Sequence, residues 1–285
     1  MIMSRDKIKS ITDNNLSFYR TLHHFKRYGE FSNLEQFRDY VSWAKSNTIK
    51  IYVLGNGSNT LFTRKDIKSL ILKNKLSKHI NSLPEYRLEV SSSVLVIDVL
   101  KYCYENSFDS FYYLASVPAT LGGALAMNAG RAKHHHRTIY DFVESVTFFD
   151  VERDCIRTLG KEEIVIGHRQ TIFTGIHSYL ILSAILKFSP ISMEGNPITE
   201  RCKWSKKFQD NSEPNCGSVF KESESKILKQ LQGMRIGKAC FSAKTTNWIL
   251  NSSDSSIPIL ILITFAKFLH FLNIKKAILE VILVD

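Results

Sequence analysis

The chain has 285 residues, of which 44% are hydrophobic and 23% are charged, and its formal net charge is +11. This composition is typical of a globular protein long enough to bury a sizeable core, and it excludes an intrinsically disordered chain. The basic residues occur in small scattered groups rather than in one dense tract, so we expect no nucleic-acid partner. A positive surplus attracts nucleotides equally well, because they are also polyanions.

Cysteine usage and hydropathy indicate the compartment. Five cysteines, an odd number without a CxxC pair, argue against a disulfide framework and against a zinc knuckle. The N-terminal segment has no apolar stretch typical of a secretion signal. Residues 257–274 approach the length of a membrane span, but they include Lys267, His270 and Asn273. We therefore expect a cytoplasmic protein without a membrane partner, in which this stretch is a buried or half-buried helix.

In chain order, the first clear element is a helix from Asn33 to Ser46. Ser32 and Glu35 form a capping box, and the apolar residues that follow share one helical face. A buried strand over 51–54 comes next and ends abruptly at Gly55. Further along, the pattern predicts strands at 69–72, 86–90, 144–150 and 179–188, and a helix at 96–106.

The last third of the chain is expected to form a separate unit. After Pro190 the composition turns polar up to Pro214, which is typical of a connection. A helix at 223–231, a strand at 239–242 and the apolar helix follow. Because short helices and strands alternate without an internal repeat, we predict an α+β architecture.

Directly behind the predicted strand at 51–54 stand Gly55, Asn56, Gly57, Ser58 and Asn59. Small residues there let successive backbone N–H groups turn toward one point, as in a phosphate-binding nest. From the pattern alone, a plain glycine turn is an equal alternative. A Rossmann fingerprint is excluded, because the third glycine and the helix behind it are missing.

A second loop of small residues lies further along the chain. Its proline stiffens the entry, its paired glycines let the backbone approach a flat or charged ligand, and Asn128 offers both a donor and an acceptor. Two such loops suggest a ligand as long as a dinucleotide. The cofactor-binding candidates in the second loop are Ser116, Val117, Pro118, Ala119, Thr120, Gly122, Gly123, Asn128, Ala129 and Gly130.

Five motifs in the same order resemble those of the UDP-N-acetylenolpyruvoylglucosamine reductase (MurB) family. The family's GxGSN, GIPGTxGGAxxMNAG, GYRxSxF, PSAGSxFKNP and, in part, LExEV motifs are matched at 55–59, 116–130, 167–173, 214–223 and 277–281. The short interval between Arg169 and Ser218 resembles the compact branch of this family.

The resemblance implies a vanillyl-alcohol-oxidase/PCMH-like fold that holds FAD between two N-terminal domains, expected at 15–75 and 76–190. A third domain at 191–285 would bind the nucleotide sugar. NADPH would reduce the flavin, and the flavin would reduce the enolpyruvyl group of UDP-N-acetylglucosamine enolpyruvate to give UDP-N-acetylmuramate for peptidoglycan. We expect the enzyme to be a monomer.

The resemblance also implies roles for particular residues. Ser218 matches the family's proton donor, and Arg169 and Glu280 match the residues that bind and polarise the substrate carboxylate. Taken singly, each has another explanation: a surface ion pair for Arg169, a helix cap for Ser218 and a solvated charge for Glu280. The substrate-binding candidates are His168, Lys221 and Glu222.

Several positions depart from the family pattern. Ser116 and Ala119 replace glycines of the second loop, and a Cβ there narrows the backbone freedom beside the flavin. Glu222 replaces an asparagine, and an acid beside a diphosphate is repelled. His168 replaces a tyrosine, and Thr245 stands where a histidine is usual.

These departures leave alternatives open. One is a MurB-like flavoprotein that acts on a different nucleotide sugar. Another is a non-catalytic protein that binds a flavin or a nucleotide sugar. The third alternative, a basic nucleic-acid binder, depends on the net charge of +11 instead.

Two further candidates are set aside. Three consecutive histidines, His134 to His136, cannot all face one direction, so we predict no metal site there. Cys216 lies two residues before Ser218 but has no histidine at a suggestive position, so we expect a small buried thiol.

Overall fold

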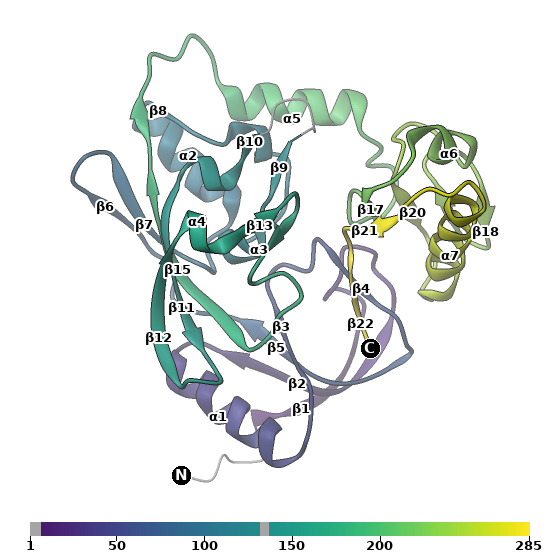
Figure 1. Ribbon diagram of the computed structural model, residues 1–285, viewed down its shortest axis with the longest axis horizontal. Coiled ribbons are helices and arrows are strands. Elements are labelled where there is room, and N and C mark those ends of the chain that lie inside the picture. Colours follow the sequence, from purple (N-terminus) through teal and green to yellow (C-terminus); the bar gives the residue numbers. More distant parts are fainter. Residues whose placement is uncertain (1–6, 132–136) are drawn as a thin grey trace. The chain divides into compact units, whose positions relative to one another are not determined.

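The computed structural model describes residues 7–131 and 137–285 (Figure 1). The chain forms two compact units, and each is assembled from separate stretches of sequence. Among the described residues, the first unit contains residue 7 and the stretches 29–56 and 72–203, and the second contains 8–28, 57–71 and 204–285. Strands β2 (His23–Phe31) and β5 (Asp66–Asn74) and helix α5 (Pro197–Phe208) each begin in one unit and end in the other.

An antiparallel five-stranded sheet forms the framework of the first unit. Each neighbouring pair in the order β12-β11-β15-β7-β6 is antiparallel. The inward side chains of β7, β11 and β15 bury against helices α2 and α3 and form one apolar cluster. The strands are β6 (Ile80–Leu83), β7 (Arg87–Ser91), β11 (Val143–Asp150), β12 (Cys155–Gly160) and β15 (Tyr179–Lys187), and the helices are α2 (Val96–Glu105) and α3 (Leu121–Ala126).

Shorter elements complete the first unit. They are β3 (Ile51–Leu54), β8 (Phe108–Asp109), η2 (Tyr112–Leu114), β9 (Gly130–Arg131), β10 (Arg137–Thr138), η3 (Ile139–Asp141), α4 (Lys161–Ile164), β13 (Val165–Gly167), β14 (Gln170–Thr171) and β16 (Ser189–Pro190). Three two-stranded ribbons pair β9 with β10, β13 with β14, and β8 with β16.

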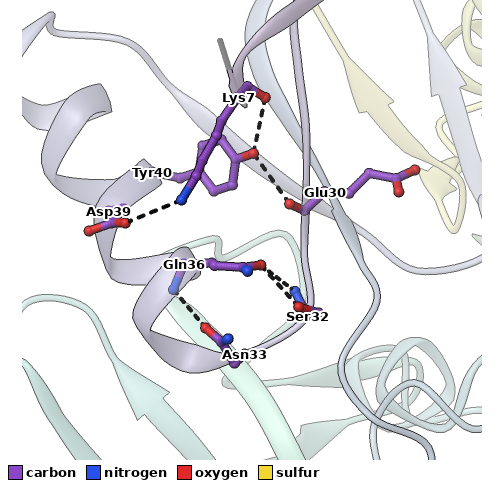
Figure 2. Close-up of polar contacts among 7 residues, drawn as sticks. All are labelled: Lys7, Glu30, Ser32, Asn33, Gln36, Asp39 and Tyr40. Carbon is purple, nitrogen blue, oxygen red and sulfur yellow. Dashed lines mark hydrogen bonds and ion pairs between the residues drawn. The ribbon is translucent and has the colours of Figure 1, made fainter. Parts of the chain in front are cut away.

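Helix α1 (Leu34–Ser46) also belongs to the first unit, and Figure 2 shows how it begins. The side chain of Asn33 accepts a hydrogen bond from the Gln36 amide at 2.9 Å, and the Gln36 side chain accepts one from the Ser32 amide at 2.9 Å. The predicted box of Ser32 and Glu35 is therefore wrong by one residue. Asn33 is the N-cap because its own side chain reaches the exposed amide.

The second unit is built from short strands and two helices around its own apolar cluster. β18, β19 and β20 form an antiparallel sheet, β17 pairs with β21, β22 runs parallel to β4, and β1 pairs with β2. The elements are β1 (Lys9–Asp13), β4 (Thr60–Phe62), β17 (Phe220–Glu222), α6 (Ser225–Gln230), β18 (Arg235–Ile236), β19 (Ala239–Phe241), β20 (Ile249–Asn251), α7 (Ile257–Leu272), β21 (Ile278–Leu279) and β22 (Ile282–Val284).

The α+β class is confirmed, and most predicted elements are present within one to three residues. The main error is the polar connection expected after Pro190, because α5 lies within it. Asn196 caps this helix by accepting from the Thr199 amide at 3.0 Å, although most of the helix is polar and carries little hydrophobic periodicity.

Candidate flavin and substrate site

The first glycine loop leaves β3 and passes from the first unit into the second between Asn56 and Gly57. In the first unit, the side chain of Asn56 donates to the Pro118 carbonyl oxygen at 2.7 Å. A Cβ on Gly55 would lie 2.7 Å from the Thr120 hydroxyl oxygen. The structure thus brings the start of the first loop against the second loop, and any larger residue at position 55 would force the Thr120 side chain to move.

The end of the loop is anchored within the second unit. Gly57 has φ +75°, and its carbonyl accepts from the Phe18 amide at 3.1 Å. The side chain of Asn59 donates to the Glu280 carbonyl at 3.0 Å, and the Asn59 carbonyl accepts from the Ile282 amide at 2.9 Å. The loop end therefore lies directly beside the backbone of the candidate residue Glu280.

The backbone N–H groups of residues 56–59 make no hydrogen bond to any described residue. Gly57 is buried and its three neighbours are half-buried, so these four successive N–H groups are open to an acceptor from outside the chain. Together with the left-handed backbone of Gly57, they have the composition of an anion-binding nest.

Most backbone amides of the second loop are occupied by hydrogen bonds within the first unit. The amides of Val117, Ala119, Leu121, Gly122 and Gly123 all donate to acceptors of the first unit. These N–H groups are already satisfied. The loop therefore presents close-packed small residues to its surroundings rather than a second nest.

The two substitutions in this loop have different surroundings. Ala119 is buried within the apolar cluster of the first unit, so its extra Cβ is accommodated by the core. Ser116 is half-buried.

Asn128 and Arg169 form one arrangement in the first unit. The Asn128 side chain is buried, its Nδ2 donates to the Gly167 carbonyl at 3.0 Å, and its Oδ1 has no partner among the described residues. The Arg169 guanidinium donates to the carbonyls of Asn128, at 2.9 Å, and Gly130. From its motif, Arg169 is expected to bind a substrate carboxylate. The structure adds that its side chain is tied to the end of the second glycine loop.

Ser218 and Glu280 lie on neighbouring paired segments of the second unit. Ser218 follows Gly217, which has φ +74°, and forms a bridge with Trp248. The amide of Glu280 donates to the Val219 carbonyl at 2.8 Å. Both side chains are half-buried, and the Ser218 hydroxyl makes no hydrogen bond to a described residue. The backbone thus places Ser218 and Glu280 on adjacent segments of the second unit.

The remaining substrate candidates are more exposed. Lys221 is half-buried on β17, whereas Glu222 on the same strand and His168 of the first unit are exposed. The Glu222 carboxylate can therefore stay hydrated, which lowers the cost of an acid at this position.

One network of the second unit escaped the sequence analysis. The Thr245 hydroxyl accepts from the Asp210 amide at 2.7 Å, and the Ser242 hydroxyl donates to the Asp210 carboxylate at 2.6 Å. Burial favours a higher pKa for Asp210, but hydrogen bonds from Ser212 and Ser242 outweigh it and lower the pKa from its ordinary value. Thr245 thus fastens the segment before Ser218. In the sequence, only the spacing of Ser242 and Thr245 could have indicated this network.

Cys216 is buried, as predicted, and its sulfur lies 3.5 Å from the Thr60 carbonyl. Burial raises the pKa of its thiol to about 12, so it stays protonated at neutral pH. Within 7–131 and 137–285, no group of three or more His, Cys, Asp or Glu side chains could hold a metal ion. His134 to His136, for which we predicted no metal site, lie outside the described residues.

Three observations fit FAD to this chain. The N–H groups of 56–59, which have no partner among the described residues, suit a diphosphate. The tight contact at Gly55 disfavours a side chain at that position of the loop. The buried Oδ1 of Asn128 lacks a donor, and a flavin N–H could supply one.

The fold and these loops define the chain as a protein with an FAD binding domain, since the family model described by that name matches residues 27–158. The match includes both glycine loops. The crystal structure of UDP-N-acetylenolpyruvylglucosamine reductase from Thermus caldophilus superposes with a TM-score of 0.78 at 18% identity, covering 98% of this chain and 99% of that one. At this identity the likeness establishes the fold.

Sequence relatives establish the family. UDP-N-acetylenolpyruvoylglucosamine reductase from Francisella tularensis is 31% identical over 84% of this chain and 93% of its own length. The Aquifex aeolicus protein of the same name is 27% identical over 94% of this chain and 89% of its own. The chain belongs to the UDP-N-acetylenolpyruvoylglucosamine reductase family.

Proposed function

We propose that this protein is an FAD-dependent reductase that uses NADPH to convert UDP-N-acetylglucosamine enolpyruvate to UDP-N-acetylmuramate in peptidoglycan synthesis. The observation that carries the proposal is its likeness to the Francisella tularensis reductase over 84% of this chain and 93% of that one. Ser218, Arg169 and Glu280, which match the family's catalytic positions, are all retained.

The two glycine loops would hold the cofactor. Backbone N–H groups of 56–59 would bind the diphosphate, and Asn128 would accept a hydrogen bond from the flavin ring. When bound, FAD supplies hydride transfer between NADPH and the substrate double bond.

The protein's own residues would then act on the substrate. Ser218 would donate a proton to the reduced substrate, and its hydroxyl is not committed to another described residue. Glu280 would lie beside it through the backbone contact at Val219. Arg169 would bind the substrate carboxylate, because its planar fork suits two-point contact and its position is fixed by Asn128 and Gly130.

The variant Ser218→Ala tests this proposal. We expect the purified variant to keep its FAD absorption and lose about 100-fold or more of its turnover number, because general acid catalysis contributes at least that factor. Ser225→Ala, an exposed serine of the same unit, is the matched control and should turn over normally. A wild-type protein that takes up no FAD would overturn the flavoenzyme, and full activity in Ser218→Ala would overturn the role of Ser218 alone.

A second candidate is a MurB-like flavoprotein that acts on a different nucleotide sugar, and Glu222 favours it. An exposed acid in place of the family's asparagine repels a diphosphate that comes near. Comparing NADPH oxidation with several enolpyruvyl and other unsaturated nucleotide sugars separates the two. A yellow protein that oxidises NADPH with none of them would be a binding protein.

The setting of the enzyme is also part of this proposal. All five cysteines are free thiols, which supports a reducing compartment such as the cytoplasm. No helix of the described chain is long and apolar enough to cross a membrane. A monomeric state, the absence of a nucleic-acid partner and the three domains at 15–75, 76–190 and 191–285 stay predictions.

A further inference from the structure

Helix α7 is apolar on nearly every side, but only one side is buried. The buried side faces β18, β19 and α6 within the second unit. Its inward residues are Ile259, Leu262, Ile263, Ala266 and His270. A helix that is hydrophobic all round is normally enclosed by protein or lipid. We therefore expect the outer side of α7 to contact a partner.

The exposed side forms a continuous line, which we name the α7 stripe. It consists of Ile257, Ile261, Phe265, Phe268 and Phe271. Their spacing of three or four residues places them above one another on one helical face. Phe271 is 77% exposed and Phe268 is 53% exposed, so these rings lie largely in solvent. A contiguous apolar surface of this kind marks an interaction site.

The charges on α7 and just beyond its C-terminal end are all positive, whereas the exposed Asp254 precedes its first turn. Lys267 is exposed at its edge, and Lys275 and Lys276 are exposed just beyond the end of the helix. Between residues 257 and 279 there is no acidic side chain, and the whole chain carries +11. The partner must therefore offer both an apolar layer and negative charge.

We propose that the α7 stripe docks the protein on the surface of an anionic lipid bilayer. The helix would lie in the plane of the interface with its phenylalanine rings among the acyl chains. The three lysines would extend to the lipid phosphates, because a long lysine side chain can bury its methylene groups and keep its ammonium group in water. A second copy of the chain fits less well, because it would bring lysine against lysine.

Vesicle flotation of the full FAD-loaded protein tests the proposal. We expect retention on vesicles that mix phosphatidylcholine with phosphatidylglycerol, weak retention on phosphatidylcholine alone, and release as salt is added. The double variant Phe268→Ser and Phe271→Ser should lower the partition coefficient at least about tenfold. Lys275→Gln and Lys276→Gln should each lower it by roughly fivefold.

Ile156→Ser is the matched control, because Ile156 is 55% exposed on β12 but lies outside the stripe. It should float like the wild type. FAD absorption and the melting temperature of every variant must match the wild type, which separates lost docking from lost folding. Absence of retention on the anionic vesicles, or equal retention on neutral vesicles with no effect of the lysines, would overturn the proposal. A dimer in sedimentation that the phenylalanine variants abolish would show a second copy as the partner and would also overturn it.

Discussion

At the scale of single residues, glycines are constrained at some positions and free at others. Gly57 has φ +75°, and a Cβ there would lie 2.1 Å from the Leu16 carbonyl oxygen. Gly233 has φ +79°, but a Cβ there would meet nothing within 4 Å. Any other residue would therefore be strained by the left-handed backbone at both positions. The two positions differ only in the space available for a Cβ atom.

We predict that Gly57→Ala lowers the free energy of unfolding far more than Gly233→Ala. The left-handed backbone alone costs an alanine roughly 1–2 kcal/mol at either site. The overlap with Leu16 adds to this cost at position 57, and the shift it forces would also disturb the free N–H groups of the loop. Thermal unfolding and FAD titration of both variants measure the difference. Equal losses in both variants would contradict the crowding at Gly57.

A second residue-scale prediction concerns His177, whose ring lies 4.4 Å from that of Tyr52 between centroids. Burial lowers the pKa of His177 from 6.5 to about 4. The unfolded chain therefore binds a proton at a pH where the folded chain does not. The contribution of His177 to the free energy of unfolding is fully present above pH 6.5 and is lost as the pH falls toward about 4.

The measurement is the melting temperature across this range in wild type and in His177→Phe, which cannot be protonated. The variant should show a weaker loss on the acid side. The pKa of His23 is also lowered by burial, so part of the acid loss should remain in His177→Phe. An unchanged acid profile would show that His177 is not the group responsible.

At the scale of elements, helix starts depend on a single side chain. The sequence pattern predicts Ser32 as the N-cap of α1, but the structure shows Asn33 in that role. The Phe37 ring packs against the Phe31 ring, with 5.0 Å between their centroids. The Tyr40 hydroxyl then donates to the carbonyls of Lys7 and Glu30 and ties the helix to the preceding strand (Figure 2). Which of two adjacent polar residues caps a helix depends on the angle at which the chain enters, and packing decides that angle.

We predict that Asn33→Ala destabilises the protein by about 1 kcal/mol, because the Gln36 amide loses its acceptor. Asn33→Ser should lose only a few tenths of that, since serine is also a good N-cap. Ser32→Ala should have a smaller effect than Asn33→Ala, because the backbone amide of residue 32 still donates to the Gln36 side chain in this variant. Chemical denaturation of the three variants gives the order, and a larger loss in Ser32→Ala would restore the original assignment.

At the scale of the whole molecule, two apolar clusters define two units, and the chain passes between them several times. The FAD binding domain match at 27–158 takes residues from both units. A cofactor held by this region would bind the folded chain and not the unfolded one, so it should stabilise the fold by mass action.

We predict that FAD at 100 times its dissociation constant stabilises the protein by about 2.7 kcal/mol and raises the melting temperature on the order of 5 °C. Riboflavin, which lacks the diphosphate, should have little effect if residues 56–59 bind that group. Differential scanning fluorimetry of the cofactor-free protein with each ligand provides the test. An equal rise in melting temperature with riboflavin would show that the flavin ring, rather than the diphosphate, provides the binding energy.

The sequence by itself determined the α+β class, the positions of most helices and strands, the two glycine loops, the family and the candidates Ser218, Arg169 and Glu280. These follow from local periodicity, small-residue patterns and motif order, each of which depends only on the order of residues in the sequence.

Only the tertiary structure decided which N–H groups are free, since Gly122 and Gly123 of the second loop donate their amides within the first unit, whereas residues 56–59 donate theirs to no described residue. It also decided the contacts of Arg169 with the second loop, the Asp210–Ser242–Thr245 network and the exposed side of α7. Each of these depends on partners distant in sequence or on burial, and hydropathy along the chain cannot distinguish an apolar face that packs from one that remains in solvent.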